Sequence, residues 1–300
     1  TVPAAVSARR FARATSSRWF DLQVSVPRLL VAGLRGGGGK TLLSLGLAAS
    51  FRSRGLIVAP FKKGPDYIDA SWLSRAASRP CRNLDLFLFD SSVALRSFQA
   101  NSADADLAII EGNRGRFDGM DPEGSFSSAE LAKLLKAPVL LSVDVTKTTR
   151  TAAAQVLGCQ TLDPEVPLAG VVLNRVAGAR HEAILRETIE GICGIPVLGA
   201  IPRLRRDPFP ERHLGLVPPQ ETEEADDPIE TVRDVAERYL DLEGILSLAR
   251  KASSSPLPPQ GNRGRVQIHP GNGPKEPSRA EAPENRKVRI GVFRDSAFQF

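Results

Sequence analysis

A glycine-rich segment near the start of the chain has the residue types of a phosphate-binding loop. Residues 33–41 are GLRGGGGKT. The common pattern G-x-x-x-x-G-K-[ST] requires a glycine six residues before its lysine, but Leu34 holds that place before Lys40. Lys40 would reach the β- and γ-phosphates of a nucleotide, and Thr41 would offer its hydroxyl to Mg²⁺. The N–H groups expected to surround the anion at a helix N-terminus are those of Gly36, Gly37, Gly38, Gly39 and Lys40.

A flexible glycine turn without a ligand is the alternative interpretation of this segment. The apolar run of residues 29–32 comes directly before the loop, and a helix pattern opens at Thr41. A strand, a glycine loop and a helix in that order are the context that a phosphate loop requires. The order therefore favours phosphate binding.

A second segment, residues 61–69, supplies candidate catalytic carboxylates. Its sequence FKKGPDYID places Asp66 and Asp69 in a turn stiffened by proline. A β-turn alone would explain Gly-Pro-Asp, but it requires neither the paired lysines before it nor Asp69 after it.

A third segment closes a buried strand with an acid. Residues 106–111, DLAIIE, end in Glu111, and the glycine-rich residues 112–119 that follow contain Asp118. An acid at that place beside a phosphate loop can hold Mg²⁺ directly or through water. Thr41 and Glu111 are therefore the candidate metal ligands.

The elements around these segments alternate between strands and helices. Continuous apolar strands interleaved with helices indicate a parallel sheet covered on both faces, in which ligands bind at the carboxyl ends of the strands. We expect Trp72 and Phe87 to lie in the core. The expected strands are residues 29–32, 56–60, 107–110, 139–143, 168–173 and 196–200, and the expected helices include 41–54, 129–135, 149–157 and 180–192.

Composition limits the classes of partner. The net charge of +6 suits a nucleotide or a polycarboxylate as well as a nucleic acid. Aromatic residues make up only 6% of the chain, and no basic cluster alternates with them, so we expect no nucleic-acid partner. Three widely separated cysteines argue against a disulfide framework and favour reduced thiols of a cytoplasmic protein. No apolar run is long enough to cross a membrane.

Composition also predicts the domain organisation. Residues 1–26 are rich in Arg and Ser and predict a disordered extension in preference to a transit peptide. Residues 27–250 would form the nucleotide-binding domain. Residues 251–286 are rich in Pro, Gly and Ser, which predicts a linker, and residues 287–300 would be the first strand of a further domain that is cut off.

Residues 28–220 resemble the cobyrinate a,c-diamide synthase family, the glutamine-dependent amidoligases of corrin biosynthesis. The specific motifs are F-K-x-G-P-D-Y-I-D at residues 61–69 and E-G-x-x-G-x-x-D-G at residues 111–119. Arg35 and the loop after it resemble the deviant K-G-G-x-G-K-T loop of the MinD and dethiobiotin-synthetase superfamily, with arginine in place of the signature lysine. Residues 290–300 resemble the opening strand of a class I glutamine amidotransferase domain. Supporting motifs are R-N-L-D at 82–85, A-E-L-A-K at 129–133, L-N-R-V at 173–176, R-H at 180–181 and P-V-L-G-A-I-P-R at 196–203.

The resemblance implies a chemistry and a set of roles. ATP would phosphorylate a substrate carboxylate to an acyl phosphate, which ammonia, taken from glutamine in the full-length protein, would convert to an amide. Asn174 matches the adenine-binding asparagine of the superfamily, although an Asn that caps a strand is nearly as good a reading. The implied catalytic residues are Lys40, Asp66, Asp69 and Asp118. The implied tetrapyrrole-binding residues are Lys62, Tyr67, Ile68 and Asp85.

Two alternatives stay open at this point. The same chemistry could act on another carboxylated tetrapyrrole, such as sirohydrochlorin or its metal or haem-type forms. A MinD- or ParA-type ATPase switch could also use such a loop, but it would not need the carboxylates of residues 66, 69 and 118. Leu34 and Asn113-Arg114 depart from the family pattern, which usually has Thr and Val-Met there. The expected partners are the tetrapyrrole, ATP and ammonia or glutamine, and a homodimer is possible.

Overall fold

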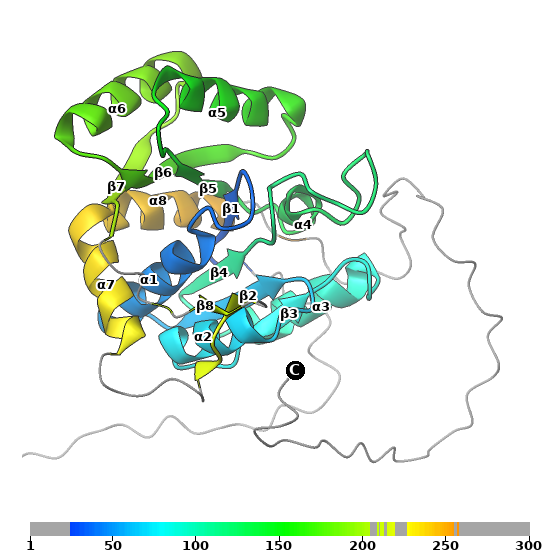
Figure 1. The fold of residues 1–300 in the computed structure, drawn as a ribbon. Helices are drawn as coiled ribbons and strands as arrows, with labels where there is room; N and C mark the ends of the chain where they lie inside the picture. Colours follow the sequence, from blue (N-terminus) through cyan, green and yellow to red (C-terminus); the bar gives the residue numbers. More distant parts are fainter. Residues whose placement is uncertain are drawn as a thin grey trace, which may run out of the picture.

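The computed structural model describes residues 25–204, 209, 211–212, 215–219, 227–254 and 257. Its centre is a seven-stranded parallel sheet with the strand order β3-β2-β4-β1-β5-β6-β7 (Figure 1). The expected doubly covered parallel sheet of the P-loop NTPase type is confirmed. The strands are β1 (Arg28–Gly33), β2 (Val58–Lys63), β3 (Arg82–Leu84), β4 (Leu107–Glu111), β5 (Val139–Asp144), β6 (Leu168–Val176) and β7 (Val197–Pro202), and β8 (Glu211–Arg212) pairs with β9 (Gly215–Leu216) in a separate antiparallel ribbon.

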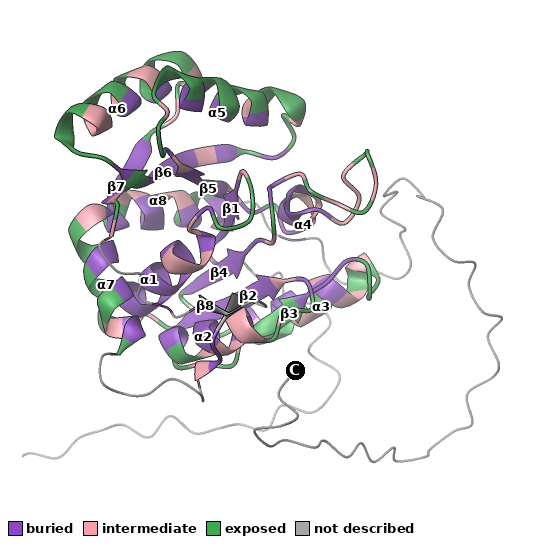
Figure 2. Ribbon diagram, viewed as in Figure 1, coloured by how far each residue is buried: buried purple, intermediate pink, exposed green. Residues whose placement is uncertain are grey.

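Helices cover both faces of the sheet. Alternate residues of each strand point to opposite faces, so Leu30 packs with one set of helices and Leu29 with the other. One face is covered by α3 (Ser91–Ser102), α4 (Ser128–Leu134), α5 (Arg150–Leu162) and α6 (Ala179–Cys193). The opposite face is covered by α1 (Lys40–Ser53), α2 (Ile68–Ala77), α7 (Pro228–Tyr239) and α8 (Leu242–Ser253). Burial on both faces explains why the strands are apolar without alternation (Figure 2).

The sheet brings the chemistry-bearing segments to one edge. Because all seven strands are parallel, the connections that follow them meet at their carboxyl ends (Figure 1). β4 lies between β1 and β2, and its last residue Glu111 is in register with Val31 on one side and Lys62 on the other. The phosphate loop after β1, the lysine pair of β2 and the acid of β4 therefore lie side by side.

Of the two aromatic residues expected in the core, Trp72 lies there and Phe87 does not. Trp72 is fully buried, as expected, and its Nε1–H donates to the carbonyl of Val217 at 2.9 Å. The expectation for Phe87 was wrong, because its side chain is 52% exposed. Phe87 lies in the connection between β3 and α3, where the sheet no longer covers it.

Only a few of the expected domain boundaries fall within the residues that the structure describes. Val26 is already buried against the core, and α8 continues to Ser253, past the expected start of the linker at residue 251. Most of the expected extension at residues 1–26 and of the linker, and all of residues 287–300, lie outside the described residues. Within the described part of the chain, the helices are too short or too polar to span a membrane.

A candidate phosphate-loop active site

The phosphate loop connects β1 to α1 as predicted. Gly37 and Gly39 have φ angles of 66° and 90°, which favour glycine. A Cβ on Gly39 would also lie 2.1 Å from Nδ2 of Asn174, so this position has no room for a side chain. Lys40 begins the helix, is buried, and its Nζ donates to the carbonyl of Arg35 at 3.0 Å. Burial lowers the pKa of Lys40, and the nearby Glu111 carboxylate opposes that shift.

A buried ionic cluster lies directly beside the loop. The ammonium of Lys62 is 2.8 Å from Oε1 of Glu111 and 2.6 Å from Oδ2 of Asp69. The same Glu111 oxygen accepts the hydroxyl of Thr41 at 2.8 Å. Burial lowers the pKa of Lys62, but the attraction of Glu111 and Asp69 outweighs it and raises that pKa above its ordinary value. The ammonium of Lys62 therefore links two carboxylates, and its expected contact with the substrate stays a prediction.

The oxygens of this cluster fit a magnesium ion. Oε2 of Glu111 is buried and has no hydrogen-bond partner, and the hydroxyl of Thr41 lies next to the same carboxylate. Hard oxygen ligands of this kind are those that Mg²⁺ prefers, and Mg²⁺ is commonly held by one or two protein groups together with substrate phosphates and water. Among the described residues, no group of three or more His, Cys, Asp or Glu side chains has metal-binding geometry. A metal bound here would therefore depend on the nucleotide for further ligands.

The carboxylate of Asp118 lies in a loop that is attached to the phosphate loop. The backbone N–H of Arg116 donates to the carbonyl of Gly33 at 2.7 Å, and the N–H of Gly115 donates to Oδ2 of Asp118 at 2.7 Å. A Cβ on Gly115 would lie 2.7 Å from the carbonyl oxygen of Leu34, so the two loops pack closely. Asp118 itself is exposed, which leaves its second oxygen open to a ligand.

Asp66 precedes α2, and its side chain accepts a hydrogen bond from the backbone of the first helical turn. Its Oδ1 accepts the backbone N–H of Asp69 at 2.9 Å. Burial raises the pKa of Asp66, and the neighbouring charge of Asp69 raises it further. Asp66 lies in the predicted turn, but Asp69 does not, because helix α2 already begins at Ile68.

The other side of the loop meets two polar strand residues. Nδ2 of Asn174 donates to the carbonyl of Gly38 at 3.3 Å, and Oγ of Ser142 donates to the same carbonyl at 2.8 Å. Asn174 is therefore buried beside the phosphate loop, at the carboxyl end of β6. Sequence reasoning missed Ser142, although a serine within the apolar run VLLSV was an available signal.

Sequence reasoning also missed a group at this edge in which a largely buried carboxylate pairs with two exposed arginines. Oδ2 of Asp144, at the end of β5, accepts from Arg35 at 3.0 Å and from Arg175 at 2.9 Å. Burial alone would raise the pKa of Asp144, but hydrogen bonds from Thr146 and Arg35 and the charge of Arg175 lower it to about 2. Arg35 is thus paired within the chain through Asp144.

The expected tetrapyrrole-contacting residues lie at the β2–β3 side of the same edge. Tyr67 is 44% exposed and Ile68 is half-buried. Asp85 is buried, and its Oδ1 accepts the backbone N–H groups of Phe87 and Leu88 at 2.7 and 3.0 Å. Asp85 therefore shapes the β3–α3 connection, and its expected contact with the substrate stays a prediction.

Comparison with known proteins agrees with this geometry. A model of the "CobQ/CobB/MinD/ParA nucleotide binding domain" family matches residues 29–216, which is more than half of the chain. The chain belongs to this family. The matched range contains the phosphate loop, the Lys62–Glu111–Asp69 cluster and Asn174, so the CobQ/CobB/MinD/ParA domain carries the whole candidate site.

Curated relatives of the chain share its sequence over almost its full length. A "Cobyrinate a,c-diamide synthase" of Magnetococcus marinus is 46% identical over 275 residues, which cover 92% of this chain and 56% of that protein. One of Archaeoglobus fulgidus is 39% identical, covering 93% of the chain and 57% of that protein. A "Hydrogenobyrinate a,c-diamide synthase" of Streptomyces coelicolor is 38% identical, covering 93% and 61%. The chain therefore spans somewhat more than half the length of each of these relatives.

Proposed function

We propose that the chain is the ATP-binding part of an amidoligase that converts the a- and c-side-chain carboxylates of cobyrinate to amides. The observation that carries the proposal is the Glu111 carboxylate. It is held between the ammonium of Lys62 and the hydroxyl of Thr41, with one free oxygen, beside a phosphate loop. The names of the relatives supply the substrate, and the basic net charge suits a polycarboxylate.

The proposed reaction has two steps. A carboxylate oxygen of the substrate attacks the γ-phosphorus of ATP, and ADP leaves. The nitrogen of ammonia then attacks the acyl carbon, phosphate leaves and one proton is released. In such a transfer the protein contributes mainly position and charge stabilisation.

The chain's own residues have separate roles in these steps. Lys40 leaves the carbonyl of Arg35 and binds the β- and γ-phosphates. Thr41 and Glu111 hold Mg²⁺, which when bound neutralises charge on the phosphoryl group. Lys62 holds the carboxylates of Glu111 and Asp69 in place. Asp118, on the loop attached to the phosphate loop, handles the acyl phosphate and the incoming ammonia.

The proposal also covers the nitrogen source, the location and the ligands of the whole protein. Ammonia would come from glutamine in a longer protein, because the relatives are nearly twice as long as the matched region. We place the protein in the cytoplasm, with ATP and a tetrapyrrole as its ligands. A MinD- or ParA-type switch has no evident use for the carboxylates of Asp66, Asp69 and Asp118 around the loop, so we favour the enzyme.

Trapping of the acyl phosphate tests the mechanism. The chain is incubated with cobyrinate, ATP, Mg²⁺ and hydroxylamine in the absence of ammonium. Hydroxylamine attacks an acyl phosphate, so we expect a cobyrinate hydroxamate and one phosphate released per hydroxamate. Phosphate release without hydroxamate would refute the acyl-phosphate route.

A further inference from the structure

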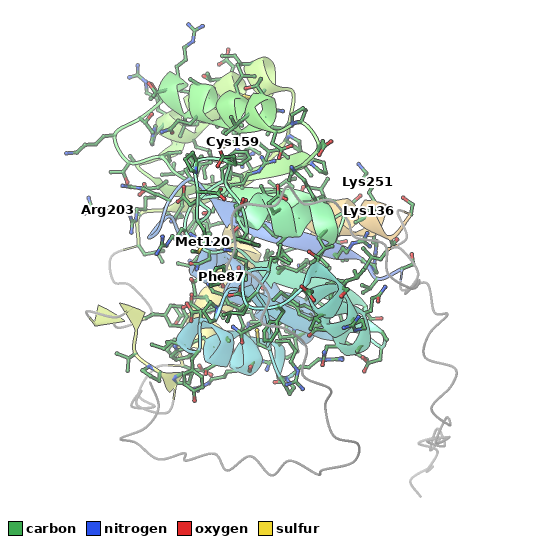
Figure 3. The ribbon with its side chains drawn as sticks, turned by 90° about the vertical axis from the view of Figure 1, so that its right-hand side faces the viewer. Phe87, Met120, Lys136, Cys159, Arg203 and Lys251 are labelled. Atoms are coloured by element: carbon green, nitrogen blue, oxygen red, sulfur yellow. The ribbon has the colours of Figure 1, made fainter. Side chains whose placement is uncertain are left out.

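Two connections at the carboxyl edge of the sheet carry three large apolar residues outside the cluster described above. The rings of Phe87 and Phe126 meet edge to face, with centroids 5.6 Å apart. The backbone of Met120 is hydrogen-bonded to Ser125, next to Phe126. Phe87 is 52% exposed and Met120 is 65% exposed. Figure 3, which looks onto the right-hand side of the view in Figure 1, labels Phe87 and Met120. We call Phe87, Met120 and Phe126 the aromatic edge.

The two connections that carry the aromatic edge also carry residues of the proposed active site. Met120 and Phe126 belong to the same β4–α4 connection as Asp118. Phe87 is positioned by Asp85, which accepts its backbone N–H. Phe87 and Met120 are thus exposed apolar side chains on separate connections, and each lies near a proposed catalytic or binding residue in the sequence. This arrangement favours a ligand-binding surface over exposure without a function.

Two cationic residues lie at the same edge of the sheet, Lys63 in register with Leu84 and Arg114 in the β4–α4 connection. Lys63, at the end of β2, is half-buried and lies close enough to Asp85 and Arg114 for their charges to affect it. Arg114 is exposed and lies in the same connection as Met120. An apolar surface with lysine and arginine at its border is complementary to an apolar ring that carries carboxylates on its periphery.

We propose that the aromatic edge binds the apolar face of the tetrapyrrole, while Lys63 and Arg114 bind carboxylates that are not reacting. This inference rests on the proposed function and adds residues to it. Contact with Phe87 and Met120 would orient the ring so that one side-chain carboxylate at a time reaches Asp118 and the phosphate loop. Binding energy from non-reacting parts of a substrate is a common means of such orientation.

Equilibrium dialysis with cobyrinate tests the inference, because the pigment's visible absorbance reports binding directly. The full chain and its variants are dialysed with Mg²⁺ and a non-hydrolysable ATP analogue. We expect Phe87→Ser and Met120→Ser each to weaken cobyrinate binding about tenfold, as for the loss of one buried apolar side chain, with affinity for the analogue unchanged. The matched control is Leu162→Ser, since Leu162 is 69% exposed at the end of α5 where β6 begins, at the opposite edge of the sheet. Leu162→Ser should bind cobyrinate as the parent does.

The outcomes separate the inference from the proposed function. Equal cobyrinate affinity in the parent and both serine variants would overturn the inference. So would variants that change only the oligomeric state in size-exclusion chromatography, because a second copy would then be the occupant. Failure of the parent to bind cobyrinate would also overturn it. Binding that depends on the aromatic edge, without amide formation in the parent, would overturn the proposed function and leave the inference standing.

Discussion

Lys62 and Glu111 form a buried ion pair in which Nζ and Oε1 are 2.8 Å apart and both side chains are withdrawn from solvent. The pair joins the ends of neighbouring strands β2 and β4, which are in register at these two residues. Burying two charges costs free energy that is recovered only with good geometry and further hydrogen bonds. Thr41 and Asp69 supply those bonds, so the phosphate loop and the first turn of α2 are both tied to this pair.

Lys62→Met should destabilise the protein strongly. It leaves Glu111 as a buried charge without its partner, and breaking a buried pair in this way costs about 3–5 kcal/mol. Urea unfolding followed by circular dichroism gives the free energy of unfolding. The matched control is Arg54→Met, which removes an exposed pair with Glu243 of the same 2.8 Å length and should cost no more than about 1 kcal/mol. Equal losses in the two variants would show that the Lys62–Glu111 pair has no special weight.

Lys40→Ala should abolish productive use of ATP and leave the fold intact. In the described part of the chain, the Nζ of Lys40 donates to a single loop carbonyl, so its removal costs little structure. The phosphoryl group would lose the cation that we propose binds it. Phosphate release with cobyrinate and ammonium measures the activity, and thermal unfolding checks the fold. Turnover like that of the parent would show that the loop does not act on ATP.

Asp118→Asn should lower kcat for amidation by about two orders of magnitude or more, as expected if the Asp118 carboxylate accepts the proton that the attacking ammonia loses. The affinity for ATP should change little, because the proposed role of Asp118 begins after the nucleotide binds. Calorimetric titration with a non-hydrolysable analogue supplies the comparison. Parallel losses in kcat and nucleotide affinity would instead place Asp118 on the nucleotide.

Stability should respond to acid through Asp144. Its pKa in the folded chain is about 2, below the ordinary value of about 3.9. A lowered pKa contributes stability that is present above the unfolded value and is lost as the pH falls toward 2. The stability difference between the parent and Asp144→Asn should therefore shrink from pH 5 to pH 2, as measured by urea unfolding. A difference that stays constant over this range would rule out the linkage.

The 300-residue chain should use ammonium and ignore glutamine as a nitrogen donor. A glutamine-hydrolysing cysteine needs a lowered pKa and an adjacent base. The chain contains three cysteines, and burial raises the pKa of Cys81, Cys159 and Cys193. Amidated product from glutamine alone, free of ammonium, would reveal a glutaminase site within these residues.

Local pattern predicted most of the fold and of the phosphate site. Strands such as residues 107–110 are apolar throughout because both of their faces are buried. The glycines of GGGGKT indicate a loop directly from the sequence. Pattern could not predict that Lys62 bridges two carboxylates, because that contact depends on the register of β2 with β4. The sequence pattern also led us to expect Phe87 in the core. An aromatic residue between Leu86 and Leu88 does not indicate that the segment after β3 is no longer covered by the sheet. The ion pairs of Asp144 were missed because one arginine partner comes from the phosphate loop and the other from strand β6, both distant in sequence.

The most direct test of the account is a mass-spectrometric screen of carboxylated tetrapyrroles with the parent chain, ATP, Mg²⁺ and ammonium. Cobyrinate, hydrogenobyrinate and sirohydrochlorin would be offered separately. We predict that cobyrinate exchanges two carboxyl hydroxyls for amino groups in successive steps, and that both exchanges require ATP. ATP hydrolysis without an amide on any of the three rings would contradict the account and favour a nucleotide switch.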